Sequence, residues 1–164
     1  MISRLVCDLT KGHAMADEHY LEDFAVGQKF ESRSITITAA EIKAFASQFD
    51  PQPFHLDEQA ASKTFFGGLV ASGWHTAALT MRLIVDSELK IAGGSIGAGA
   101  DELKWPRPVR PGDTLRAVSE VLDIRTSKSR PDQGIIKMRT QTLNQEGQTV
   151  MNFVANMVVP RRPT

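Results

Sequence analysis

The chain has 164 residues, of which 41% are hydrophobic and 23% are charged, proportions that fit a single globular domain with a substantial core. Lysine and arginine balance aspartate and glutamate at 19 each, so the net charge gives no reason to expect a nucleic-acid partner. Cys7 is the only cysteine, which excludes an intramolecular disulfide and a thiolate-rich zinc site, and no apolar run approaches the about 20 residues that cross a bilayer.

The N-terminal segment shows no pattern of a packed element. Its apolar patch, "LVC", is too short for the core of a signal peptide. Residues 1–18 are therefore expected to form a flexible extension, with translation starting at either Met1 or Met15, and residues 19–164 to form the domain. Composition and N-terminus together favour a cytoplasmic protein that does not bind membranes.

A strand and a short helix are predicted next. Residues 29–38 alternate apolar and polar side chains, as a half-buried strand does. Thr38 then precedes a helical pattern over residues 39–49, and Glu41 stands three positions later, which is the spacing of a capping box. The apolar positions expected on one buried face of this helix are Ile42, Phe45, Ala46 and Phe49.

The short helix must end near Asp50, because Pro51 and Pro53 disfavour helical geometry at the residues that precede them. The segment that follows, "DPQPFHLD", is expected to be irregular. A longer helix is predicted over residues 73–89, where apolar residues recur at helical spacing in a pattern typical of a helix covered on most sides.

Four strands are predicted in the C-terminal half of the chain, over residues 95–105, 113–126, 134–143 and 148–159, with turn-forming stretches between them. One long apolar helix followed by these strands predicts an α+β fold, in which an antiparallel sheet wraps around one central helix. Such a sheet leaves long strand edges that a second subunit can pair with, so we expect a homodimer or a higher homo-oligomer.

The stretch "DPQPFHLDEQAASKTFFGGLVASGW" carries the most specific pattern. It resembles the MaoC-like dehydratases, a hotdog-fold family that includes (R)-specific enoyl-CoA hydratases, and the resemblance extends over about residues 20–160. The family pattern is Asp-x-Asn-Pro-x-His, then Leu-Asp and, after an apolar stretch, His-Gly. The matching residues, at the same spacing, are Asp50, Pro53, His55, Leu56, Asp57 and Gly73. The resemblance implies a single hotdog domain and a lyase of the hydratase type.

Three positions depart from this pattern. Gln52 stands where asparagine is usual, Ser72 replaces the histidine before the glycine, and Met81 occupies a helix position at which such hydratases can carry a serine. The first two changes keep an amide and a small polar group, so neither removes the Asp50–His55 pair. They leave the substrate open, and Met81 removes an assisting hydroxyl.

Asp50 and His55 are the predicted catalytic residues. A carboxylate and an imidazole that share one water molecule can deprotonate it and return a proton to the α-carbon of an unsaturated thioester. The sequence does not assign the individual proton transfers. The N–H of Gly73, at the start of the long helix, is the expected oxyanion-hole donor, because unpaired amides and the helix dipole favour negative charge there. The alternative for Gly73 is a glycine that only permits close packing.

Weaker candidates surround this pair. Gln52, Ser72 and Trp74 are expected to contact substrate, although Gln52 can instead bond to neighbouring backbone and Trp74 can fill the core. Asp57 is expected to cap the next turn rather than to act in catalysis, and His75 to lie outside the site. The basic residues expected to contact the phosphates of coenzyme A, or else to form a solvated surface, are Arg107, Arg110, Lys128 and Arg130. No metal or cofactor is expected, since coenzyme A enters as the thioester substrate.

The predicted function is the reversible addition of water to a trans-2-enoyl-CoA, which gives an (R)-3-hydroxyacyl-CoA and implies a role in fatty acid metabolism. Two alternatives stay open, a hotdog acyl-CoA thioesterase and a non-catalytic acyl-CoA-binding protein. The acyl group, the pathway and the physiological direction are not determined by the sequence.

Overall fold

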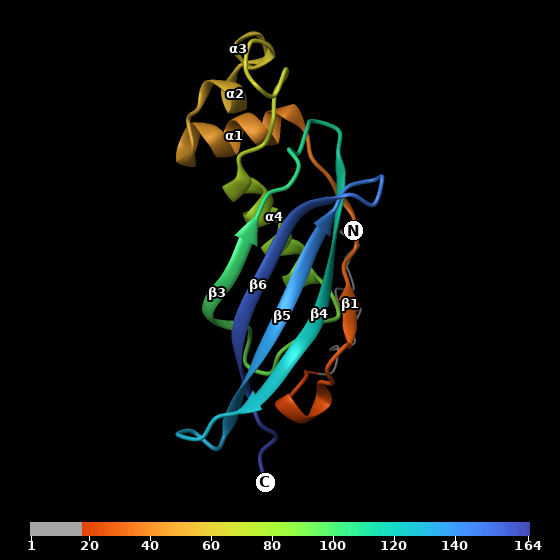
Figure 1. The fold of residues 1–164 in the computed structure, drawn as a ribbon, viewed down its shortest axis with the longest axis vertical. Helices are drawn as coiled ribbons and strands as arrows, with labels where there is room; N and C mark the ends of the chain where they lie inside the picture. The colour runs from red at the N-terminus through yellow and green to blue at the C-terminus, as the bar shows by residue number, and fades with distance from the viewer. Residues whose placement is uncertain (1–17) are drawn as a thin grey trace, which may run out of the picture.

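The computed structural model describes residues 18–164 (Figure 1). All but the last residue of the predicted N-terminal extension, including Met15 and Cys7, lies outside this range, so the extension stays a prediction. The described strands are β1 (Lys29–Glu31), β2 (Ile35–Thr36), β3 (Ile96–Lys104), β4 (Thr114–Thr126), β5 (Gln133–Leu143) and β6 (Thr149–Pro160). They form one antiparallel sheet in the order β1-β4-β5-β6-β3, and β2 pairs with β4 beside β1.

The helices lie at two places relative to this sheet. They are the 3₁₀-helix η1 (Leu21–Asp23) and the α-helices α1 (Ala39–Phe49), α2 (Pro53–Leu56), α3 (Glu58–Ser62) and α4 (Gly73–Asp86). Helix α4 runs along one face of the sheet, whereas α1, α2 and α3 gather beyond the end of the sheet where β3 finishes and β4 begins (Figure 1). The predicted α+β arrangement, one long helix against an antiparallel sheet, is confirmed.

The core lies between α4 and the sheet. Strand β5 alternates buried and half-buried residues along its whole length, so its buried positions lie on the face of the sheet along which α4 runs. From α4, Ile84 packs with Val121 and Ile136, and Leu83 packs with Leu115 of β4. Each such side chain contributes about 1.5–3 kcal/mol on full burial. This packing fixes the direction of α4, and therefore the place of its N-terminus.

Three predictions about these elements need correction. The strand expected over residues 29–38 is broken into β1 and β2, because residues 32–34 are not in strand conformation and the N–H of Ala117 in β4 donates to the side-chain hydroxyl of Ser32. The segment after Asp50, expected to be irregular, contains the short helix α2, which Pro53 can begin because the first turn of a helix needs no N–H donor. Phe49, expected on the buried face of α1, is 69% exposed.

Helix α4 is also less covered than its sequence predicts. Trp74, Met81 and Val85 are 59%, 47% and 50% exposed, because this face of α4 is only partly covered in the described chain, with the Trp105 ring against Trp74. Beside it, β3 pairs only with β6, and residues 96–101 of this edge strand are exposed. The apolar face of α4 and the open edge of β3 therefore adjoin a side of the protomer that residues 18–164 leave uncovered.

Candidate active site

The end of α1 and the start of α2 bring Asp50 and His55 together. The N–H of Asp50 donates to the carbonyl of Ala46 at 2.9 Å and so ends α1. The backbone of Gln52 then joins the pair, because its N–H donates to the carbonyl of Asp50 at 2.8 Å and its carbonyl accepts from the N–H of His55 at 3.0 Å. As a result, Oδ2 of Asp50 lies 3.4 Å from Nε2 of His55.

The imidazole of His55 is buried, with 6% of the residue exposed, and its orientation is fixed from behind. Nδ1 lies 2.7 Å from the backbone carbonyl of Val70. A carbonyl oxygen only accepts, so Nδ1 carries the proton of this hydrogen bond, and in neutral His55 the lone pair is on Nε2. The nitrogen that faces Asp50 is therefore the basic one.

Ser72 connects the carboxylate to the N-terminus of α4. Its hydroxyl donates to Oδ2 of Asp50 at 2.6 Å and accepts from the N–H of Trp74 at 3.2 Å, which makes Ser72 the N-cap of the helix. The residue is 1% exposed. Because the hydroxyl proton is donated to Asp50, one lone pair accepts from Trp74 and the residue is buried, its expected contact with substrate is better described as a contact with Asp50.

Gly73 is the first residue of α4, and within residues 18–164 its N–H has no acceptor. A free amide at this position is what an oxyanion hole requires. The packing alternative is also present, because a Cβ added at Gly73 would lie 2.8 Å from Cε2 of Trp105. Close approach of the Trp105 ring thus requires glycine here, whether or not the amide binds an oxyanion.

The remaining predicted substrate contacts lie near this centre. The side chain of Gln52 is exposed, and that of Trp74 is exposed and meets Trp105 edge to face at a centroid distance of 5.5 Å. Trp74 therefore does not fill the core. Contact of these two side chains with a substrate stays a prediction.

The structure separates the four predicted phosphate-binding residues into two pairs. The guanidinium of Arg110 donates to the carbonyl of Phe66 at 2.7 Å, and Arg107 donates to the carbonyl of Thr149 at 3.1 Å, so both lie at the end of the sheet that carries Asp50. Lys128 and Arg130 lie in the β4–β5 loop at the opposite end (Figure 1). The 13 residues of β4 extend about 40 Å, so Lys128 and Arg130 do not reach the Asp50–His55 pair of their own chain.

Asp57 is placed as the sequence predicts, whereas the expectation that His75 lies outside the site stays a prediction. The His75 ring stacks on Phe45 at a centroid distance of 4.6 Å, and its buried Nδ1 has no hydrogen-bond partner within residues 18–164. Burial holds the pKa of His75 below its usual value, although the nearby Glu41 carboxylate opposes this effect. Asp57 caps α3 by accepting from the N–H of Ala60 at 2.7 Å.

Neither a metal cluster nor a membrane span is found in the described part of the chain. No group of three or more potential His, Cys, Asp or Glu ligands occurs within residues 18–164. In the same range, no helix is both long and apolar enough to cross a bilayer.

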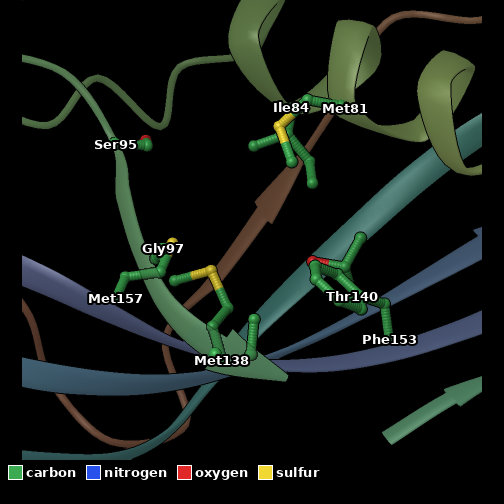
Figure 2. A pocket seen from close by; sticks show the side chains of 10 residues that line it. Met81, Ile84, Ser95, Gly97, Met138, Thr140, Phe153 and Met157 are labelled. Atoms are coloured by element: carbon green, nitrogen blue, oxygen red, sulfur yellow. The ribbon is translucent and has the colours of Figure 1, made fainter.

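An apolar pocket that sequence reasoning did not predict lies between α4 and the sheet (Figure 2). Its volume is about 240 Å³, and its walls include Met81 and Ile84 of α4 and Met138, Phe153 and Met157 of β5 and β6. None of its lining residues is charged. The alternation along β5 and β6 indicates which residues face the helix, but only the structure shows that they enclose a space.

The comparisons with known proteins decide the family. A family model of the MaoC-like domain matches residues 23–144. The chain belongs to the MaoC-like dehydratase family. It is 34% identical over 143 residues to the uncharacterised protein YdeM of Bacillus subtilis, covering 86% of this chain and 99% of that protein. It is 30% identical over 150 residues to an (R)-specific enoyl-CoA hydratase of Rhodospirillum rubrum, covering 88% of this chain and 94% of the relative.

The fold of this MaoC-like domain is shared with solved structures. The crystal structure of a MaoC-like dehydratase from Rhodospirillum rubrum matches it with a TM-score of 0.86 and 57% identity, over 89% of this chain and 99% of the other. The predicted single hotdog domain is thereby confirmed. At the level of the family, the characterised relatives are hydratases and dehydratases.

Proposed function

We propose that this protein catalyses the reversible addition of water to a trans-2-enoyl-CoA, giving an (R)-3-hydroxyacyl-CoA. The observation that carries the proposal is the 3.4 Å approach of Oδ2 of Asp50 to Nε2 of His55, beside the N-terminus of α4. The enoyl-CoA substrate and the (R) configuration are suggested by the similarity to the (R)-specific hydratase.

The two facing atoms are suited to orient one water molecule. A carboxylate oxygen accepts hydrogen bonds, and Nε2 of neutral His55 also accepts, because Nδ1 donates to Val70. One water can donate a proton to each acceptor, which directs its own lone pair away from the protein and toward the β-carbon of a bound enoyl thioester. His55 is then the base that receives the proton of the attacking water.

In the addition step, the water oxygen bonds to the β-carbon while one O–H proton moves to Nε2 of His55. The electron pair of the carbon–carbon double bond moves toward the thioester carbonyl, which becomes an enolate. The N–H of Gly73 donates to this enolate oxygen, an interaction typically worth about 3–4 kcal/mol in the transition state. The α-carbon then takes a proton from the Asp50–His55 pair, so one water is added in total, and dehydration is the reverse.

The apolar pocket supplies a place for the acyl chain. Met81 lies eight residues after Gly73, which is about 12 Å along the helix axis. A thioester whose carbonyl is held at Gly73 would therefore extend its acyl chain along α4 toward the pocket in Figure 2. Because the lining lacks charge, the proposed acyl group is an uncharged hydrocarbon chain.

The test is an assay with crotonyl-CoA that follows both the absorbance of the enoyl thioester and the release of free thiol. Loss of absorbance without thiol release is expected. Asp50→Asn and His55→Ala are each expected to lower the rate by at least about 100-fold while leaving the unfolding transition cooperative. Lys63→Ala, on an exposed residue at the end of α3, is the matched control and should retain full activity. Full activity of both site variants would refute the site.

The same assay addresses the two alternative functions. Thiol release with crotonyl-CoA or longer acyl-CoA substrates would indicate a thioesterase. Binding of acyl-CoA with neither signal would indicate a non-catalytic binding protein. Nδ1 of the buried His55 is fixed on the Val70 carbonyl, and its basic Nε2 faces Asp50, an arrangement suited to hold one water molecule. This geometry favours hydration over both alternatives, because a thioesterase needs its water at the carbonyl carbon and not at the β-carbon, and a binding protein needs no oriented water.

We also propose that the protein is a homodimer formed through the edge of β3. This edge has one hydrogen-bonding side without a partner in the described chain, and Ile96 on it is 59% exposed. Pairing with a second copy would satisfy the strand and bury the exposed apolar face of α4. Light scattering should give twice the chain mass, and Ile96→Glu should shift the species toward the monomer. A stable wild-type monomer would contradict the proposal.

A further inference from the structure

Ser72 contacts both the Asp50 carboxylate and the N-terminus of α4. It is the N-cap of α4, directly before Gly73, and it is 1% exposed. Its hydroxyl lies 2.6 Å from Oδ2 of Asp50, which is at the C-terminal end of α1. No other side chain within residues 18–164 donates a hydrogen bond to Asp50, since Nε2 of neutral His55, 3.4 Å from Oδ2, carries a lone pair.

The direction of each hydrogen bond follows from the partners. The backbone N–H of Trp74 can only donate, so Oγ of Ser72 must accept from it. An ionised carboxylate can only accept, so the single hydroxyl proton of Ser72 must point to Asp50. The three groups thus form a directed chain from the helix amide through the hydroxyl to the carboxylate, in which each hydrogen bond polarises the next.

We propose that Ser72 is a positioning residue of the hydration site, which holds the Asp50 carboxylate against His55 and fixes it relative to the N–H of Gly73. The inference rests on the proposed function. Asp50 lies at the C-terminal end of α1 and is followed by Pro51. Its side chain is 23% exposed, so other residues pack against only part of it. The Ser72 hydroxyl supplies the constraint that packing does not, and it couples the water-binding pair to the oxyanion donor through one residue.

A purely structural role for Ser72 makes a different prediction. Capping α4 requires only that Oγ accept from Trp74, and the proton that Oγ donates to Asp50 has no part in the cap. Thr38 offers a matched control, because its hydroxyl caps α1 by accepting from Glu41 at 3.2 Å and has no contact with Asp50. Loss of either cap costs stability, but only loss of Ser72 releases the carboxylate.

Four variants separate these roles in the intact protein, with crotonyl-CoA as substrate. Ser72→Ala is expected to lower kcat about 100-fold, the effect of a displacement of about 1 Å at a reacting group, while KM changes less than about threefold. Ser72→Cys keeps the volume but donates weakly, so its kcat should also fall, and Ser72→Thr, which keeps the hydroxyl, should recover most of kcat. Thr38→Ala should lose stability but keep kcat.

The proposal is overturned if Ser72→Ala or Ser72→Cys keeps wild-type kcat, or if Thr38→Ala loses as much kcat as Ser72→Ala. It is equally overturned if kcat falls only in proportion to the folded fraction, measured by circular dichroism at the assay temperature. KM and kcat are measured separately, because a general loosening of the N-terminus of α4 would weaken substrate binding and so raise KM as well as lower kcat.

Crystal structures of the wild type and of Ser72→Cys test whether Ser72 positions the Asp50 carboxylate, and they require no activity measurement. In the wild type, Oδ2 of Asp50 should lie near Nε2 of His55, as in the 3.4 Å separation here. In the cysteine variant, this separation should increase by about 1 Å or more, or the carboxylate should occupy two rotamers. An unchanged Asp50 would refute the role of Ser72. If the wild type hydrates no enoyl thioester, the proposed function fails, while these two structures still decide whether Ser72 fixes Asp50.

Discussion

Replacement of Gly73 by alanine tests the closest contact in the site. A Cβ at this position would lie 2.8, 3.0 and 3.2 Å from three atoms of the Trp105 indole, which is closer than Cβ contacts in proteins normally are. Gly73 is the first residue of α4 and is not among the glycines with a positive φ, so its backbone conformation is one that alanine also adopts. Without Trp105, the substitution would stabilise the helix by about 0.5–1 kcal/mol.

The Trp105 ring reverses the sign of this effect on stability. Overpacking typically costs about 1–3 kcal/mol, so Gly73→Ala should lower the free energy of unfolding, and each kcal/mol lost lowers Tm by about 2–4 °C in a chain of this size. In the Trp105→Ala background, where the clash is absent, Gly73→Ala should be neutral or stabilising. The two sites should therefore show a coupling energy of about 1.5–4 kcal/mol in a double-mutant cycle.

Urea unfolding of the four proteins, monitored by circular dichroism at one protein concentration, measures this coupling. Crotonyl-CoA hydration by the same proteins shows whether displacement of the Gly73 amide also lowers kcat, by about 100- to 1,000-fold if the oxyanion donor is lost completely. Additive stabilities, or a Gly73→Ala variant more stable than the wild type, would show that the indole does not lie against α4 as the structure places it.

Further substitutions test other parts of the structure. Because burial lowers the pKa of His75, the unfolded state binds the extra proton first, so stability should fall as the pH drops below about 6.5, and His75→Phe should reduce this loss in urea titrations at pH 5–7.5. Gly134→Ala should destabilise strongly, by about 3 kcal/mol, since its Cβ would lie 2.6 Å from the backbone carbonyl of Arg125, and a variant with wild-type Tm would contradict this. The double variant Lys128→Ala/Arg130→Ala should keep KM for crotonyl-CoA within about twofold of the wild type if all residues of one site come from one chain. A large rise in KM would show that another subunit brings this loop to the site.

Local patterns predicted the elements that depend on neighbouring residues. The capping box of Thr38 and Glu41 places the start of α1, and both of its hydrogen bonds are formed. The alternation of β4 and β5 predicts the buried face of the sheet. The sequence could not show that Phe49 is exposed, because Ile42 and Ala46 on the same face are buried, whereas Phe49 is the last residue of α1 and the period of a helix does not show what covers its end.

The sequence predicted those parts of the candidate site that depend on residues close together along the chain. The spacing of Asp50, His55 and Gly73 reflects one continuous path of chain, so the motif brings all three to the N-terminus of α4. The hydrogen bond from His55 to Val70 and the contact of Trp105 with Gly73 join segments far apart in the sequence, and no local pattern indicates them. The distance of Lys128 and Arg130 from the site likewise follows only from the topology of β4 and β5.

The departures from the family pattern acquire a physical meaning in this geometry. Ser72 places a hydrogen-bond donor beside Asp50 although the histidine is absent, and in the role proposed above this donor fixes the carboxylate. Met81 places an apolar side chain in the wall of the pocket where a hydroxyl would be polar, which suits the proposed uncharged acyl chain without removing any group that the proposed reaction needs. In the proposed reaction the two substitutions therefore affect separate steps, since Ser72 would act at the reacting end of the thioester and Met81 at the far end of its acyl chain.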